Sequence, residues 1–107
     1  IELFGWRVRW EGPAMEGRGY TVHVGSDKSY VAVYSGPGNQ AVPKRDASYV
    51  TRGGLNHLGV VVGDLDTVEA KVKAMGFTPT AHGDYEPGRR FYFTDDDGVE
   101  IEVISYA

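Results

Sequence analysis

An internal repeat is the feature that most constrains the fold of this chain. When the 107-residue sequence is shifted by 71 positions, glycines fall on glycines and aromatic or apolar residues on similar ones, without a gap. The matched pairs are Gly5-Trp6 with Gly76-Phe77, Gly12 with Gly83, Gly17-Arg18 with Gly88-Arg89, Tyr20 with Phe91, and Val22 with Phe93. Such a series in one register predicts two copies of one supersecondary unit.

The second copy carries the clearest helix signal. A helix is expected from about Leu65 to Met75, and either Asp64 or Asp66 can serve as its N-cap. Asp66 and Glu69 resemble a capping box, and Gly76 follows as the residue that ends the helix. The apolar positions that share one face are Leu65, Val68, Val72 and Met75.

Alternating apolar and polar residues predict strands around this helix. The expected strands are residues 6–10, 20–24, 30–34, 55–62, 91–94 and 99–105, with a loop at 11–19. Gly98, in the turn 95–98, supplies the positive φ of a tight hairpin. Each copy is therefore expected to run strand–helix–strand–strand–strand, giving an α+β protein whose curved mixed sheets surround a cleft.

The two copies divide the chain unequally. Residues 1–35 are expected to form a partial first βαβββ module, residues 36–54 a linker rich in Gly and Pro, and residues 55–107 the second module. Under the same shift, about 17 residues of strand and helix are missing from the front of the first module. A segment ahead of Ile1 is the favoured explanation, because the partial module leaves a sheet edge open.

Composition excludes several classes of function. The chain contains no cysteine, so it has no disulfide, thiolate metal site or cysteine nucleophile. Its formal net charge of −4 argues against nucleic acid or an anionic membrane as the main partner. No apolar run is long enough to cross a bilayer and no signal peptide opens the sequence, so a cytoplasmic protein is expected.

One acidic residue stands out within the last expected strand. Glu102 lies between Ile101 and Val103, and a carboxylate among apolar neighbours is costly to bury unless it is paired, hydrogen-bonded or bound to a cation. It is either an exposed edge residue, a salt-bridge partner or a ligand. Arg89 and Arg90 before the preceding strand are expected to be a solvated charge pair.

The run LNHLGVVVGDLDTVEAKVKAMGF, followed by GRRFYFTDDDGVEIEVISY, resembles the vicinal oxygen chelate superfamily of glyoxalases, bleomycin-resistance proteins and extradiol dioxygenases. The likeness is good over residues 55–106 and weaker over 5–35. Asp96 replaces the proline of the family's usual Asp-Pro-Asp-Gly turn. The resemblance implies paired βαβββ modules, a homodimer, and a divalent metal ion held by His and Glu.

By position, this resemblance implies that His57 and Glu102 are metal ligands. Fe, Mn, Ni, Co or Zn would suit such a nitrogen and oxygen pair. The corresponding strand of the first module offers only Val31 or Ala32, neither of which can bind a metal. Tyr92, ten residues before Glu102, matches a tyrosine of the extradiol dioxygenases. His82 lies near the place of their catalytic histidine, with a spacing one residue longer.

Two functions of different classes remain open. The first is a metal-dependent enzyme, such as a dioxygenase, lyase or isomerase, that acts on a small oxygenated molecule. The second is a metal-free protein that binds a small molecule or antibiotic, as bleomycin-resistance proteins do. His57 together with Glu102 favours the enzyme; the missing ligand at Val31 or Ala32 favours the binding protein.

Overall fold

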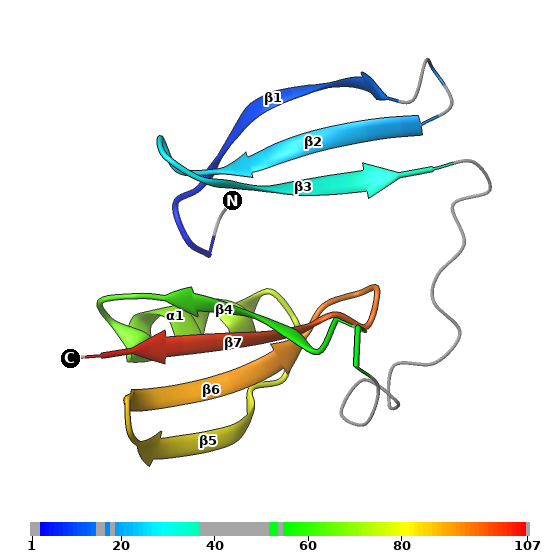
Figure 1. Ribbon diagram of the computed structural model, residues 1–107. Helices are drawn as coiled ribbons and strands as arrows, with labels where there is room; N and C mark the ends of the chain where they lie inside the picture. Colours follow the sequence, from blue (N-terminus) through cyan, green and yellow to red (C-terminus); the bar gives the residue numbers. More distant parts are fainter. Residues whose placement is uncertain (1–2, 15–16, 18, 37–51, 54, 107) are drawn as a thin grey trace. The chain divides into compact units, whose positions relative to one another are not determined.

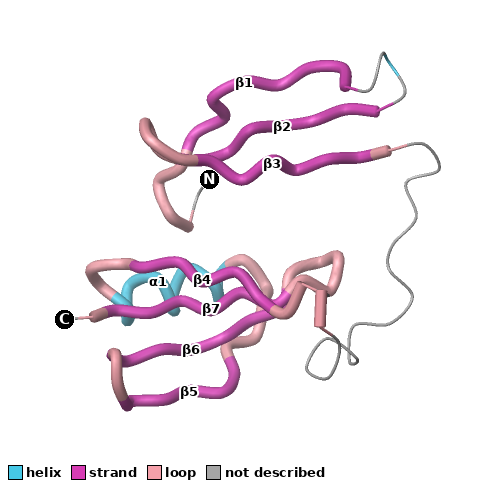
Figure 2. Tube along the Cα trace, viewed as in Figure 1, coloured by secondary structure: helices cyan, strands magenta, loops and turns pink. Residues whose placement is uncertain are grey.

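The computed structural model describes residues 3–14, 17, 19–36, 52–53 and 55–106. The chain forms two compact units, Ile1–Ala41 and Val42–Ala107, which are described separately below. Most of the expected linker, including residues 37–51, lies outside the described residues. Figures 1 and 2 show the strands of both units and the helix of the second unit. The observed fold is α+β with strands predominating, which confirms the expected fold class.

The first unit contains a three-stranded antiparallel sheet in the order β1-β2-β3 (Figure 1). Its strands are β1 (Arg7–Ala14), β2 (Gly19–Gly25) and β3 (Tyr30–Ser35). The loop expected at residues 11–19 is wrong in its first half, because β1 stays paired with β2 as far as Ala14. Pro13 is tolerated in β1 because this strand lies at the edge of the sheet.

The second unit contains a four-stranded mixed sheet in the order β4-β7-β6-β5, with one helix on one face (Figure 1). Its elements are β4 (His57–Val61), α1 (Leu65–Ala74), β5 (Thr80–Tyr85), β6 (Gly88–Thr94) and β7 (Glu100–Ser105). β4 pairs with β7 in parallel, and the other neighbours are antiparallel. The order strand–helix–strand–strand–strand is the one that the sequence predicts.

Helix α1 begins and ends as its sequence indicates. The Asp64 side chain is the N-cap and accepts a hydrogen bond from the Thr67 backbone N–H, whereas the expected alternative cap Asp66 lies within the first turn. Gly76, with φ of 93°, follows the C-cap residue Met75. Met75 is exposed, which corrects its expected place on the buried face: the helix ends there.

The core of the second unit lies between α1 and the sheet. Its buried apolar side chains are Val60, Leu65, Val68, Val72, Phe91, Phe93 and Val103. Phe91, Val72 and Val103 are fully buried, so they fix the helix against β6 and β7. Residues that alternate with these along the strands point to the opposite face of the sheet, and the candidate site is built there.

Candidate functional site

The strand register brings the two expected metal ligands to one face of the second unit's sheet. Gly59 on β4 pairs with Glu102 on β7, and Glu102 pairs on its other side with Tyr92 on β6. His57 is two residues before Gly59, so its side chain lies on the same face. Three side chains singled out from the sequence, those of His57, Tyr92 and Glu102, therefore meet on three adjacent strands.

His57 and Glu102 are in direct contact. The His57 Nε2 atom lies 3.2 Å from Glu102 Oε1; the Glu102 side chain is 13% exposed and the His57 side chain 32% exposed. The other ring nitrogen, Nδ1, is hydrogen-bonded to Asn56 Oδ1, which fixes the orientation of the ring. When Nδ1 donates this bond, Nε2 presents a lone pair to a carboxylate oxygen. Such an arrangement needs a proton or a cation between the two atoms.

Arg90 holds the second oxygen of the same carboxylate. Its Nη1 donates a hydrogen bond of 3.0 Å to Glu102 Oε2, and the Arg90 side chain is 9% exposed. Its Nη2 donates to three backbone carbonyl oxygens of the β5–β6 turn, those of Tyr85, Glu86 and Gly88. The guanidinium group also lies over the Tyr85 ring, with 4.3 Å between Cζ and the ring centroid.

The expectation of a solvated arginine pair is therefore wrong for Arg90. Only Arg89 is half exposed, and it pairs with Asp66 of α1. The sequence held a signal that was missed, since Arg90 is two residues before Tyr92 in a strand and must share its face. The inward charge is tolerated because Glu102 and the three carbonyl groups partner it.

Tyr92 stands beside this ion pair. Its ring lies edge-on to the His57 ring, with 5.5 Å between the centroids. Burial, followed by the negative charge of Glu102, raises the pKa of Tyr92 above its ordinary value, and a hydrogen bond with Arg90 opposes the rise. The hydroxyl group therefore keeps its proton at neutral pH.

The donor atoms fit part of a metal site. Two ligand atoms that each lie about 2.1 Å from one ion at right angles are about 3 Å apart, close to the distance between His57 Nε2 and Glu102 Oε1. Gly59 also leaves room, because a Cβ atom there would lie 3.5 Å from Glu102 Oε1. Within the described parts of the chain, however, no group of three or more His, Cys, Asp or Glu side chains could hold a metal ion.

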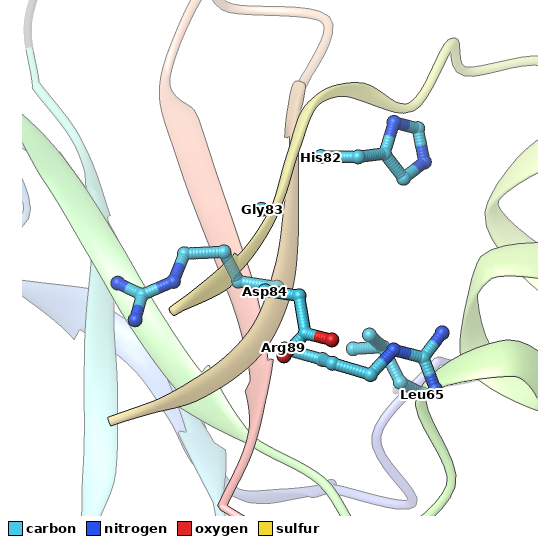
Figure 3. Close-up of a pocket in the computed structure, with 6 residues that line it drawn as sticks. Leu65, His82, Gly83, Asp84 and Arg89 are labelled. Carbon is cyan, nitrogen blue, oxygen red and sulfur yellow. The ribbon is translucent and has the colours of Figure 1, made fainter. Parts of the chain in front are cut away.

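His82 is not brought together with these residues. Its Nε2 atom lies 2.7 Å from Glu69 Oε2 on α1, and its ring contacts Phe91, which points to the helix side of the sheet. Figure 3 shows the side chains of His82 and Arg89 directed toward the helix. They line a hollow of about 250 Å³ together with Leu65, Gly83, Asp84 and Arg90. Because its side chain faces the helix, His82 is remote from the face that carries His57.

The sequence matches the Glyoxalase/Bleomycin resistance protein/Dioxygenase superfamily over residues 1–103. The chain belongs to this superfamily. The resemblance on which the ligand positions rest is thereby confirmed. Members of the superfamily commonly bind divalent metals and small molecules. Among curated proteins, no sequence matches this chain.

Solved structures of superfamily proteins share the fold. A glyoxalase/bleomycin resistance protein/dioxygenase domain from Frankia sp. EAN1pec is 20% identical, with a TM-score of 0.76 over 97% of this chain and 80% of that one. The trypanothione-dependent glyoxalase I of Leishmania major is 16% identical, with a TM-score of 0.73 over 98% of this chain and 72% of that one. The antibiotic-binding protein TnmS3 from Streptomyces sp. CB03234 is 18% identical, with a TM-score of 0.66 over 98% of this chain and 78% of that one. Both an enzyme and a binding protein are thus built on this superfamily fold.

The described residues of the first unit of this superfamily member add no clear metal ligand. Ala32 on β3 pairs with His23 on β2, and Trp10 on β1 pairs with His23 on the other side. The His23 ring stacks on Tyr30, with 4.1 Å between the centroids, and also contacts Trp10. His23 is thus held by the aromatic rings of Trp10 and Tyr30. No helix among the described residues is long and apolar enough to cross a membrane.

Proposed function

We propose that this chain is part of a divalent-metal-dependent enzyme that acts on a small oxygenated molecule. His57 and Glu102 would hold the metal through Nε2 and Oε1. The observation that carries the proposal is the 3.2 Å contact between these two atoms on one sheet face, beside Gly59, which has no Cβ atom to fill the space next to Oε1. Such a site supports a dioxygenase, a lyase or an isomerase.

A bound metal would supply a Lewis acid, or a platform for O₂, beside His57 and Glu102. The protein's own groups have separate tasks. Asn56 fixes the His57 ring, and Arg90 fixes the Glu102 carboxylate. The Tyr92 hydroxyl group, which stays protonated at neutral pH, would donate a hydrogen bond or a proton to a substrate oxygen.

Metal analysis of purified protein tests this proposal. The wild type is expected to hold close to one divalent ion per chain, and His57→Ala and Glu102→Ala are expected to hold less than about a tenth of that. His82→Ala is the matched control, because this histidine lies on the helix side of the sheet and should leave the metal content unchanged. Catechols and the thiol adducts of α-ketoaldehydes are the first substrates to try.

The second candidate is a metal-free protein that binds a small molecule or an antibiotic. Two observations favour it: the guanidinium group of Arg90 already neutralises Glu102, and the described residues supply no third metal ligand. Under this alternative, protein that stays metal-free after incubation with Fe, Mn, Ni, Co and Zn salts would bind an aromatic antibiotic in calorimetry. Metal retained by the wild type and lost from His57→Ala would exclude it.

A further inference from the structure

We propose that Arg90 and a divalent cation compete for the carboxylate of Glu102. This inference rests on the proposed metal function and adds a residue that tunes the site. A hydrogen-bonded ion pair joins Arg90 Nη1 to Glu102 Oε2 at 3.0 Å, whereas Oε1 faces His57. The carboxylate therefore offers an incoming cation only one of its two oxygens.

The guanidinium group is held in place and cannot easily move aside. Its Nη2 donates to the carbonyl groups of Tyr85, Glu86 and Gly88, so a swing away from Glu102 would leave these acceptors of the β5–β6 turn without their donor. The Arg90 side chain is 9% exposed and that of Glu102 is 13% exposed, so little water screens the pair. The Arg90 Nε atom is also buried and has no hydrogen-bond partner in the described structure.

A cation bound at Oε1 would experience this fixed positive charge at close range. The guanidinium repels the cation and also withholds Oε2, which could otherwise join Oε1 in a bidentate carboxylate ligand. Removing the positive charge should therefore increase metal affinity, the opposite of what is expected for a residue that merely supports the site. Replacing Arg90 with lysine should not increase metal affinity, because the ammonium group retains the positive charge.

Titration with Mn²⁺ alone, followed by the loss of its free electron paramagnetic resonance signal, tests the competition. Arg90→Gln and Arg90→Met are expected to bind Mn²⁺ at least about tenfold more tightly than the wild type. The glutamine variant keeps a donor for the turn carbonyls, so it guards against a folding defect in the methionine variant. Arg90→Lys should stay within about threefold of the wild type.

Arg89→Gln is the matched control, since Arg89 is the adjacent arginine and pairs with Asp66 on the helix side. It should leave Mn²⁺ affinity unchanged. If the wild type binds Mn²⁺ and neither neutral Arg90 variant binds it more tightly, the competition is overturned while the metal function stands. Absence of Mn²⁺ binding in every variant would overturn the competition, and absence of Fe, Ni, Co and Zn binding as well would overturn the metal function.

A double-mutant cycle on metal-free protein tests the ion pair without any metal. Unfolding by urea is measured for the wild type, Arg90→Gln, Glu102→Gln and the double variant. Each single change should strand a largely buried charge, so the double variant should lose less stability than the sum of the two single losses. Strict additivity would overturn the pair on which the competition depends.

Discussion

Tyr92 illustrates how one residue's neighbours set its chemistry. Burial and the carboxylate of Glu102 both disfavour the negatively charged phenolate, and together they outweigh the hydrogen bond from Arg90. The pKa of Tyr92 is therefore raised from its ordinary value of 10.0. A tyrosine in this state can donate a proton or a hydrogen bond, but it is a poor anionic ligand at neutral pH.

Glu102→Gln is expected to lower the pKa of Tyr92 without returning it to the ordinary value, because burial is the larger cause and remains. The measurement is a spectrophotometric titration of the phenolate band, with the curve of the matching Tyr92→Phe variant subtracted. The raised pKa also determines how Tyr92 affects the free energy of unfolding as pH changes. Well below pH 10 Tyr92 adds no pH dependence, and above that value it lowers the stability of the fold as pH rises. An unchanged Tyr92 titration in Glu102→Gln would contradict the assigned charge effect.

At the scale of single elements, helix α1 depends on its N-cap. The Asp64 side chain accepts hydrogen bonds from the Thr67 hydroxyl and backbone N–H groups, and these bonds lower the pKa of Asp64. Asp64→Ala should reduce the free energy of unfolding, whereas Asp64→Asn, which keeps a capping oxygen, should reduce it much less. Urea unfolding of the three proteins at neutral pH checks this ranking.

The same cap has a predictable pH dependence. Because the pKa of Asp64 is lowered on folding, the charged side chain stabilises the folded protein. This stabilisation is fully present above the ordinary pKa of 3.8 and is lost as pH falls through the lower pKa of the folded protein. The difference in unfolding free energy between the wild type and Asp64→Ala should therefore narrow below about pH 4. A difference that stays constant down to pH 2 would show that the charge of Asp64 contributes nothing.

Local patterns in the sequence predict which elements form better than they predict the boundaries of those elements. The helix follows from Asp64, Gly76 and apolar residues three or four positions apart, and the last hairpin follows from Gly98, whose φ is 83°. The extension of β1 through Pro13 depends on pairing with β2, which single-strand propensities do not contain. The burial of Arg90 is not predicted for a related reason. It depends on an ion pair with Glu102, which lies on a separate strand and pairs with Tyr92, two residues after Arg90.

At the scale of the whole molecule, the repeat predicted two units, and each unit has its own sheet. The two sheets differ in how they are covered. The second packs one face against α1, whereas the first has no helix among the residues that the structure describes. Large side chains such as Trp10 and Tyr34 are about half exposed on the first sheet. Exposed apolar surface of this kind is typical of sites that contact a partner.

The edges of the first sheet suggest which partner that is. β1, at one edge, carries Arg7, Arg9, Glu11 and Pro13, the kinds of residue that discourage further strand pairing. β3, at the other edge, reads YVAVYS and has no charge, and Val33 within it is 56% exposed. An uncharged, apolar edge favours pairing with the same strand of a second copy about a twofold axis. For the 107-residue chain, in which the described residues leave the edge of β3 open, we therefore expect a homodimer joined along β3.

Sedimentation velocity over a range of protein concentrations tests this dimer. The wild type should sediment as a dimer, and Val33→Lys should shift the protein to monomer, because the new charges would face each other across the twofold axis. Val8→Lys places the same charge on β1, which already carries charged side chains, and should leave the dimer intact. A wild type that stays monomeric at every concentration, or a Val33→Lys protein that remains dimeric, would rule out association through β3.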